Sequence, residues 1–157
     1  MTTADTHHEP ATTQYATFFL DGLYFGIRVL SVQEVIRHQD MTPVPLAPPV
    51  IRGLINLRGQ IVTALDLRER LGLTRRTDDA LPMNVVVRTA DGAVSLLVDE
   101  IDDVVEVGGE QFEQVPETIR ARVAGLVTGV YKLPSRLLLI LDVDRTIDIS
   151  GLHAEAA

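Results

Sequence analysis

The densest group of chemically capable side chains in this sequence is an acidic run, formed by Asp99, Glu100, Asp102 and Asp103. Carboxylates this close together could act as a general acid and base or hold a divalent metal ion. The run lacks the alternating Asp/Asn pattern of a calcium loop, however, and a charged run where a strand meets a turn is usually a solvated surface. We therefore keep a small β-barrel enzyme that uses Asp99, Asp102 and Asp103 as an alternative hypothesis only.

Other residue types that support catalysis or cofactor binding are absent or wrongly spaced. The chain has 0 Cys, which removes disulfides, thiol nucleophiles and thiolate zinc sites. Its 4 His residues form no ligand pair in the folded part, no Ser lies in a glycine elbow, and none of its 11 Gly residues belongs to a phosphate-binding loop. The sequence therefore predicts no catalytic residue, no metal ion and no cofactor.

Charge and hydropathy narrow the partners further. The 157 residues carry a formal net charge of −8, and this argues against nucleic acid because phosphate binding draws its affinity from clustered cations. The longest wholly aliphatic run, residues 137–141, is far shorter than the roughly 20 residues of a membrane span, and no apolar leader precedes the folded part. We expect a cytoplasmic protein that does not insert into the membrane.

One pair of opposite charges stands out among aliphatic neighbours. Arg58 lies at the expected tip of a hairpin, and Glu34 is framed by Val32 and Val35 in the segment after an earlier hairpin. If the fold closes on itself, the two charges could lie together and orient one another. The alternative is two independent surface residues, whose contact in water would contribute only about 0 to 1 kcal/mol.

The elements that must position these residues are short strands and tight turns. Three hairpins are expected at Asp21-Gly22, Arg58-Gly59 and Asp91-Gly92, because glycine accepts the positive φ of a two-residue turn. Asp66 is expected to cap a short helix that Gly72 ends. Four prolines within residues 43–49 forbid helix and central strand, so this segment is expected to be an ordered loop.

The order of these elements repeats along the chain. Residues 29–36 parallel 98–105, residues 53–55 parallel 125–127, and residues 61–66 parallel 137–142. A repeat of roughly 70 residues with about five short strands predicts an all-β fold of two small barrels that share an apolar seam, since closure removes exposed strand edges. A single larger sandwich remains the alternative.

This pattern also predicts the division of the chain. Residues 1–13 are polar and without periodicity, and are expected to be a disordered tail. Residues 14–150 are expected to form one folded unit, with its barrels at about 14–75 and 80–150, and residues 151–157 to form a C-terminal tail.

Four stretches together resemble a known family. They are TFFLDGLYFGIRVLSVQEVI, IRGLINLRGQIVTALDLRERLGL, VSLLVDEIDDVVEV and AGLVTGVYKLPSRLLLILDVD. Through them, residues 14–149 resemble the CheW family of bacterial chemotaxis coupling proteins. The resemblance implies two five-stranded SH3-like barrels around a shared hydrophobic core, with short helices. It also implies a non-catalytic adaptor of two-component signal transduction, recruited to receptor arrays at the inner membrane.

The same resemblance implies partners and contact residues. The partners are the cytoplasmic tips of methyl-accepting chemotaxis receptors and the regulatory domain of the histidine kinase CheA. The implied receptor-binding residues are Val32, Glu34, Gly53, Asn56 and Arg58. For the kinase, the resemblance implies Met41 and Val44, beside a loop that is richer in proline than the family leads us to expect. An adaptor of another receptor–kinase pathway, such as surface motility or second-messenger control, is the alternative.

Overall fold

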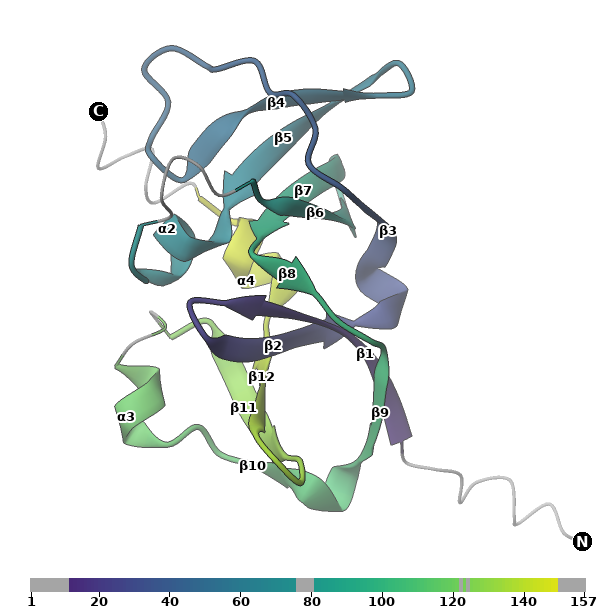
Figure 1. The fold of residues 1–157 in the computed structure, drawn as a ribbon, viewed down its shortest axis with the longest axis vertical. Helices are drawn as coiled ribbons and strands as arrows, with labels where there is room; N and C mark the ends of the chain where they lie inside the picture. The colour runs from purple at the N-terminus through teal and green to yellow at the C-terminus, as the bar shows by residue number, and fades with distance from the viewer. Residues whose placement is uncertain (1–11, 76–80, 122, 124, 150–157) are drawn as a thin grey trace, which may run out of the picture.

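The protein folds into two β-barrels stacked on one another (Figure 1). This computed structural model describes residues 12–75, 81–121, 123 and 125–149. The barrel that contains the first and the last strand, here called the terminal barrel, has strands β1 (Thr12–Leu20), β2 (Leu23–Arg28), β8 (Glu100–Ile101), β9 (Val105–Gly108), β10 (Phe112–Glu113), β11 (Val127–Lys132) and β12 (Leu137–Leu141). The other, the central barrel, has strands β3 (Val32–Ile36), β4 (Ile51–Leu57), β5 (Gln60–Asp66), β6 (Met83–Thr89) and β7 (Gly92–Val98).

Short helices lie between the strands and after the last one. They are η1 (Val29–Ser31), α2 (Leu67–Leu71), η2 (Gly109–Gln111), α3 (Glu117–Arg120) and α4 (Val143–Ile147). The predicted cap of α2 is confirmed: the Asp66 carboxylate accepts hydrogen bonds from the backbone N–H groups of Arg68 and Glu69, and Gly72 ends the helix with a left-handed φ of 76°. Asp142 caps α4 in the equivalent way.

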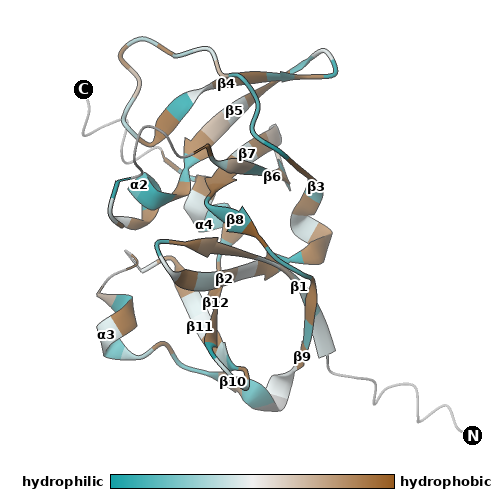
Figure 2. Cartoon of the chain, viewed as in Figure 1, coloured by the Kyte–Doolittle hydropathy of each residue, from teal (hydrophilic) through white to brown (hydrophobic). Residues whose placement is uncertain are grey.

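The three predicted hairpins are all present, as β1–β2, β4–β5 and β6–β7. At the first two, both turn residues have a positive φ, the arrangement that matches the twist of the flanking strands. The third turns one residue earlier than predicted, because Thr89 pairs with Gly92 and Gly92 is already part of β7. Figure 2 shows the β4–β5 turn as a polar tip on largely apolar strands.

The predicted division into barrels at about 14–75 and 80–150 is wrong. Hairpin β1–β2 pairs with β8, β9 and β12, whereas hairpin β6–β7 pairs with β3 and β5. Each half of the chain therefore gives its first hairpin to the barrel built mainly from the other half. The repeat itself is real, since β2 pairs in parallel with β12 just as β7 pairs in parallel with β5. Sequence order alone does not indicate this exchange.

The predicted ends of the folded unit also need correction. Thr12 and Thr13 belong to β1, where they pair with Gly108 and Val107 of β9, so they are not part of a tail. Residues 1–11 and the predicted tail at 151–157 lie outside the described residues.

Each barrel closes through one segment of the chain whose successive parts pair with both edges of the sheet. In the terminal barrel, β8 and β9 pair with β1, and β10, which follows after η2, pairs with β11. In the central barrel, β3 pairs with β6, and Thr42 further along the same segment forms an isolated bridge to Leu54 of β4. This closure makes each barrel five-stranded in effect and excludes a single open sandwich.

A glycine stands opposite each closing segment. A Cβ atom on Gly53 of β4 would lie 2.7 Å from the carbonyl oxygen of Thr42, and one on Gly129 of β11 would overlap the ring of Phe112 in β10. The strand pairing shifts register at both glycines. Closure of both barrels therefore depends on a missing side chain at equivalent positions. The predicted alignment of residues 53–55 with 125–127 is wrong, because Gly53 corresponds to Gly129.

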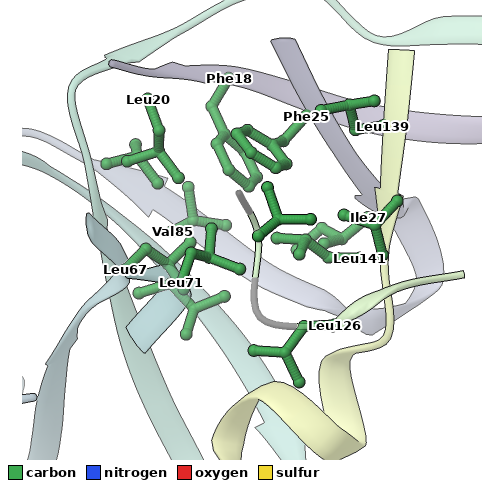
Figure 3. Packing of buried hydrophobic residues seen from close by; sticks show 14 of the residues in the cluster. Phe18, Leu20, Phe25, Ile27, Leu67, Leu71, Val85, Leu126, Leu139 and Leu141 are labelled. Carbon is green, nitrogen blue, oxygen red and sulfur yellow. The ribbon is translucent and has the colours of Figure 1, made fainter. Parts of the chain in front are cut away.

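One hydrophobic core runs through both barrels, as predicted. A single cluster of buried side chains joins Phe18 and Phe25 of the terminal barrel to Val85 of the central barrel. Figure 3 shows Leu67 and Leu71 of α2 in this same cluster, beside Val85. The two phenylalanine rings stack with centroids 6.0 Å apart. Because the core is shared, neither barrel is a separate domain.

Candidate functional site

The structure places Glu34 and Arg58 in direct contact. Nη2 of Arg58 donates a hydrogen bond to Oε2 of Glu34 at 2.5 Å. The side chain of Arg58 is 72% exposed and that of Glu34 is 19% exposed. The carboxylate thus lies at the barrel surface mostly covered, while the guanidinium on top of it faces solvent with its remaining N–H groups.

The hairpin turn between β4 and β5 presents Arg58. Arg58 itself has a φ of 50° and Gly59 a φ of 87°. Asn56, another predicted site residue, supports this turn because its Oδ1 accepts a hydrogen bond from the Gly59 backbone N–H at 2.9 Å. Leu57 is buried immediately before the turn. The arginine is therefore held in place by its neighbours despite a left-handed backbone that costs a non-glycine residue about 1 kcal/mol.

Glu34 comes from β3, where it pairs with Val86 of β6 after a register shift that follows Val32. Alternation along β3 puts Glu34 on the same half-buried face as Val32 and Ile36. Val32, also predicted for the site, packs against the shared core, and its carbonyl accepts a hydrogen bond from Arg88 Nη1 at 3.1 Å. Val32 thus supports the site by anchoring β3 to the core beneath Glu34.

Gly53 is close to the site in sequence but does not form part of its surface. It is buried under Met41 and Thr42, against which a side chain would collide. Its effect on the site is therefore indirect, through the closure that brings β4 and the segment after β3 together.

The second predicted surface is the loop that carries Met41 and Val44. Both side chains are half-buried, and Met41 packs against the small cluster of Ile55, Ala64 and Leu97. They are less exposed than a free contact surface requires. Several prolines of this loop are exposed, and its exposed large aliphatic residue is Leu46.

Sequence reasoning did not single out Leu46. Its side chain is 100% exposed and its backbone has a φ of 64°. Val44 and Ala47 close a turn around it, with Ala47 N–H donating to the Val44 carbonyl at 3.3 Å. The available signal was an apolar residue set between Pro45 and Pro48, in a loop too rigid to fold that side chain inward.

The acidic run is engaged in structural contacts. Asp99 accepts hydrogen bonds from Nη2 and Nε of Arg68 at 2.5 and 3.0 Å, and Asp102 accepts one from the Tyr24 hydroxyl at 3.0 Å. The carbonyl of Asp103 accepts from Thr17 Oγ1. The hydrogen bond to Asp99 raises the pKa of Arg68, and burial raises the pKa of Tyr24. Among the residues that the structure describes, no group of three His, Asp or Glu side chains could hold a metal ion.

Arg68 also links the two barrels. It follows the central barrel's β5, at the start of α2, and besides Asp99 it lies 3.8 Å from the Asp21 carboxylate in the β1–β2 turn. Asp21 in turn donates its backbone N–H to Asp99 at 2.9 Å.

No helix within the described ranges is both long enough and apolar enough to cross a membrane.

The structure is thus a double β-barrel of the SH3-like type, in which two barrels exchange hairpins and share one core. The chain belongs to the CheW family, since the model of the CheW-like domain matches residues 14–150. Members of this family are chemotaxis scaffold or adaptor proteins and not enzymes. The alternative hypothesis of an enzyme using Asp99, Asp102 and Asp103 is therefore wrong.

Individual relatives agree with this assignment. The chain is 31% identical over 131 residues to the chemotaxis protein CheW of Bacillus subtilis, covering 83% of this chain and 84% of the relative. It is 29% identical over 144 residues to CheW of Treponema pallidum, covering 89% and 85%. Among solved structures, the scaffolding protein TtCheW from Thermoanaerobacter tengcongensis shares the fold with a TM-score of 0.78 at 24% identity, over 88% of this chain and 94% of that one.

Proposed function

We propose that this protein is a cytoplasmic adaptor that couples methyl-accepting chemotaxis receptors to the histidine kinase CheA in receptor arrays. Its membership of the CheW family supports a scaffold role. The single observation that carries the receptor part of the proposal is the exposed Arg58 held over Glu34, within the two stretches that most resemble the family.

The proposed receptor surface is centred on Arg58, which Glu34 bonds directly and whose turn Asn56 supports, while Val32 and Gly53 act indirectly from the layer beneath. A receptor tip is a helical hairpin, and a helix binds through an apolar stripe with charges beside it. Arg58 supplies an oriented cation for an acidic or carbonyl group on that helix. Ile61, which is 61% exposed and pairs with Asn56 across the hairpin, adds apolar surface close to it. Glu34 orients the cation and Gly53 keeps the barrel closed below it.

The kinase surface is the loop that contains Met41 and Val44. We extend it to Leu46, since a fully exposed leucine on a proline-stiffened turn can enter an apolar pocket on a partner without first losing much conformational freedom. Exposed apolar groups rimmed by polar residues are a usual sign of a protein interface.

Charge-reversal variants test whether Arg58 contacts the receptor and whether Glu34 acts by orienting Arg58. Arg58→Glu is expected to weaken binding of purified receptor tips and receptor control of CheA activity, and Glu34→Arg to do the same by releasing Arg58. The double swap restores an ion pair but leaves a negative group outermost, so binding is expected to stay weak. Recovery by the double swap would mean that the pair only stabilises the barrel. Normal coupling in both single variants would contradict the proposed surface.

A further inference from the structure

The turn between β11 and β12 holds an arginine in an unusual position. The guanidinium Cζ of Arg136 lies 5.2 Å from the ring centroid of Phe19 and 4.8 Å from that of Tyr24. The two rings are themselves in contact, with centroids 4.9 Å apart. Arg136 therefore rests on an aromatic platform made by β1 and β2 of the terminal barrel, away from the Glu34–Arg58 site.

This platform is fixed from behind. The Tyr24 hydroxyl donates to Asp102 Oδ2 at 3.0 Å and also contacts Thr17 Oγ1 at 3.1 Å. Tyr24 is only 6% exposed, and Thr17 is buried. The Tyr24 ring cannot turn without breaking these contacts, so the guanidinium above it lies on a fixed aromatic surface.

Arg136 lacks the partner that comparable arginines have. Arg52, Arg58 and Arg68 each bond a carboxylate. In the part of the chain that the structure describes, the exposed guanidinium of Arg136 makes no ion pair and no hydrogen bond, only the two ring contacts. Stacking uses the flat face of the group and leaves its N–H edge open, and that edge matches the two oxygens of a carboxylate.

The surface beside this edge is an apolar cleft with a volume of about 440 Å³. Its walls include Leu23, Ile119 and Leu137, and Ser135 adds a hydroxyl next to Arg136. Figure 1 shows α3, which carries Ile119, on the same side of the terminal barrel as the β1–β2 turn. The cleft thus offers one cation at the rim and aliphatic walls within.

We propose that this cleft, here called the Arg136 cleft, binds a protein segment that carries an Asp or Glu next to an apolar side chain. The carboxylate would take the open edge of Arg136, and the apolar side chain would lie between Ile119 and Leu137. Charge complementarity selects this occupant, because an uncompensated cation on a chain of net charge −8 attracts acidic groups that the rest of the surface repels.

The test uses the full chain and two blocked tripeptides, Leu-Glu-Leu and Leu-Gln-Leu, titrated by NMR. We expect the glutamate peptide to shift the signals of Leu23, Ile119 and Leu137, and to bind about tenfold more tightly than the glutamine peptide, as loss of one charge-assisted contact implies. Arg136→Gln is expected to abolish this difference in affinity. Arg136→Lys is expected to reduce it, because lysine keeps the charge but cannot donate two parallel N–H groups to one carboxylate.

The matched control is Lys132→Gln, which removes another exposed cation from the same hairpin and should leave both affinities unchanged. Equal binding of the two peptides, no binding of either, or shifts that survive Arg136→Gln would overturn the proposal. Vesicles of phosphatidylglycerol provide the last comparison: if they bind the protein through Arg136 while the glutamate peptide does not, the site recognises a lipid surface instead.

Discussion

Glu34 and Arg58 join the two open edges of the same sheet. The central barrel has the strand order β3-β6-β7-β5-β4, so β3 and β4 lie at opposite ends of the sheet. Among the described residues, backbone pairing closes this gap at a single bridge, between Thr42 and Leu54. The ion pair from β3 to the β4–β5 turn adds a side-chain link across the same gap. The residue proposed to meet the receptor is thus also part of the barrel's closure.

Removal of this pair is expected to have little effect on stability. Arg58 is 72% exposed, and exposed ion pairs typically contribute about 0.2 to 1 kcal/mol. Arg58→Ala should therefore lower the free energy of unfolding by less than about 1 kcal/mol, measured by urea denaturation, and the difference from wild type should shrink in high salt. A larger loss would show that the link across the barrel edges is a main element of stability and that binding defects in Arg58 variants reflect unfolding.

Gly53→Ala should be much more disruptive than its small size implies. The new methyl group would meet the Thr42 carbonyl oxygen at 2.7 Å and Met41 at 3.1 Å, where the backbone must move to make room. Overpacking of this kind costs about 1 to 3 kcal/mol. Gly109→Ala is the control, because nothing lies within 4 Å of the position of its Cβ. If urea denaturation gives equal stabilities for the two variants, closure at Thr42 is looser than the contact distances indicate.

Leu46→Gly should separate stability from binding. Glycine relieves the left-handed backbone at φ 64° and removes a side chain with no buried surface, so the melting temperature should be unchanged or higher. Binding to CheA, measured by calorimetry, should weaken because the projecting leucine is lost. Leu81→Ala, at another exposed leucine, is the control for nonspecific loss of apolar surface. Unchanged affinity in Leu46→Gly would remove Leu46 from the kinase surface.

Tyr131 should make stability fall at high pH. Burial, together with a hydrogen bond to Tyr15, raises the pKa of Tyr131 from 10.0 to about 12. The folded state thus holds its proton where the unfolded state has lost it, so the stabilisation is complete below pH 10 and declines between about pH 10 and 12. Urea denaturation across this range should show a shallower decline for Tyr131→Phe. An equally steep decline in the variant would assign the effect to other groups, such as Tyr24.

Local signals in the sequence predicted local structure well. The positive φ needed at Asp21-Gly22 and Arg58-Gly59 fixed two hairpins, and the carboxylate of Asp66 fixed the start of α2. The pairing of Glu34 with Arg58 was one of two open possibilities, since it depends on closure of a sheet whose edges are 24 residues apart at these positions. The aromatic platform under Arg136 was not predicted: Phe19 and Tyr24 pair within the β1–β2 hairpin, but Arg136 reaches them through the parallel pairing of β2 with β12.

The exchange of hairpins was the main error. Hydrophobic periodicity and turn residues specify a hairpin but not the sheet that receives it. The choice is made by the shared core, in which Phe18 and Phe25 must meet side chains from both halves of the chain. Contacts of this kind lie far apart in sequence and leave no local pattern to recognise.

The exchange leads to a strong test of the whole fold. If the chain is cut between residues 75 and 81, fragment 1–75 keeps β3–β5 but loses β6 and β7, and fragment 81–157 keeps β8–β12 but loses β1 and β2. Each fragment then has an incomplete barrel and a hairpin without its neighbouring strands. Each fragment alone should therefore lack cooperative unfolding, and an equal mixture of the two should regain it. Circular dichroism and urea denaturation follow both states. A version cut within the β6–β7 turn is the control, because it separates paired strands instead of whole hairpins. Stable folding of either half by itself would show that the barrels are independent and that the shared core is dispensable.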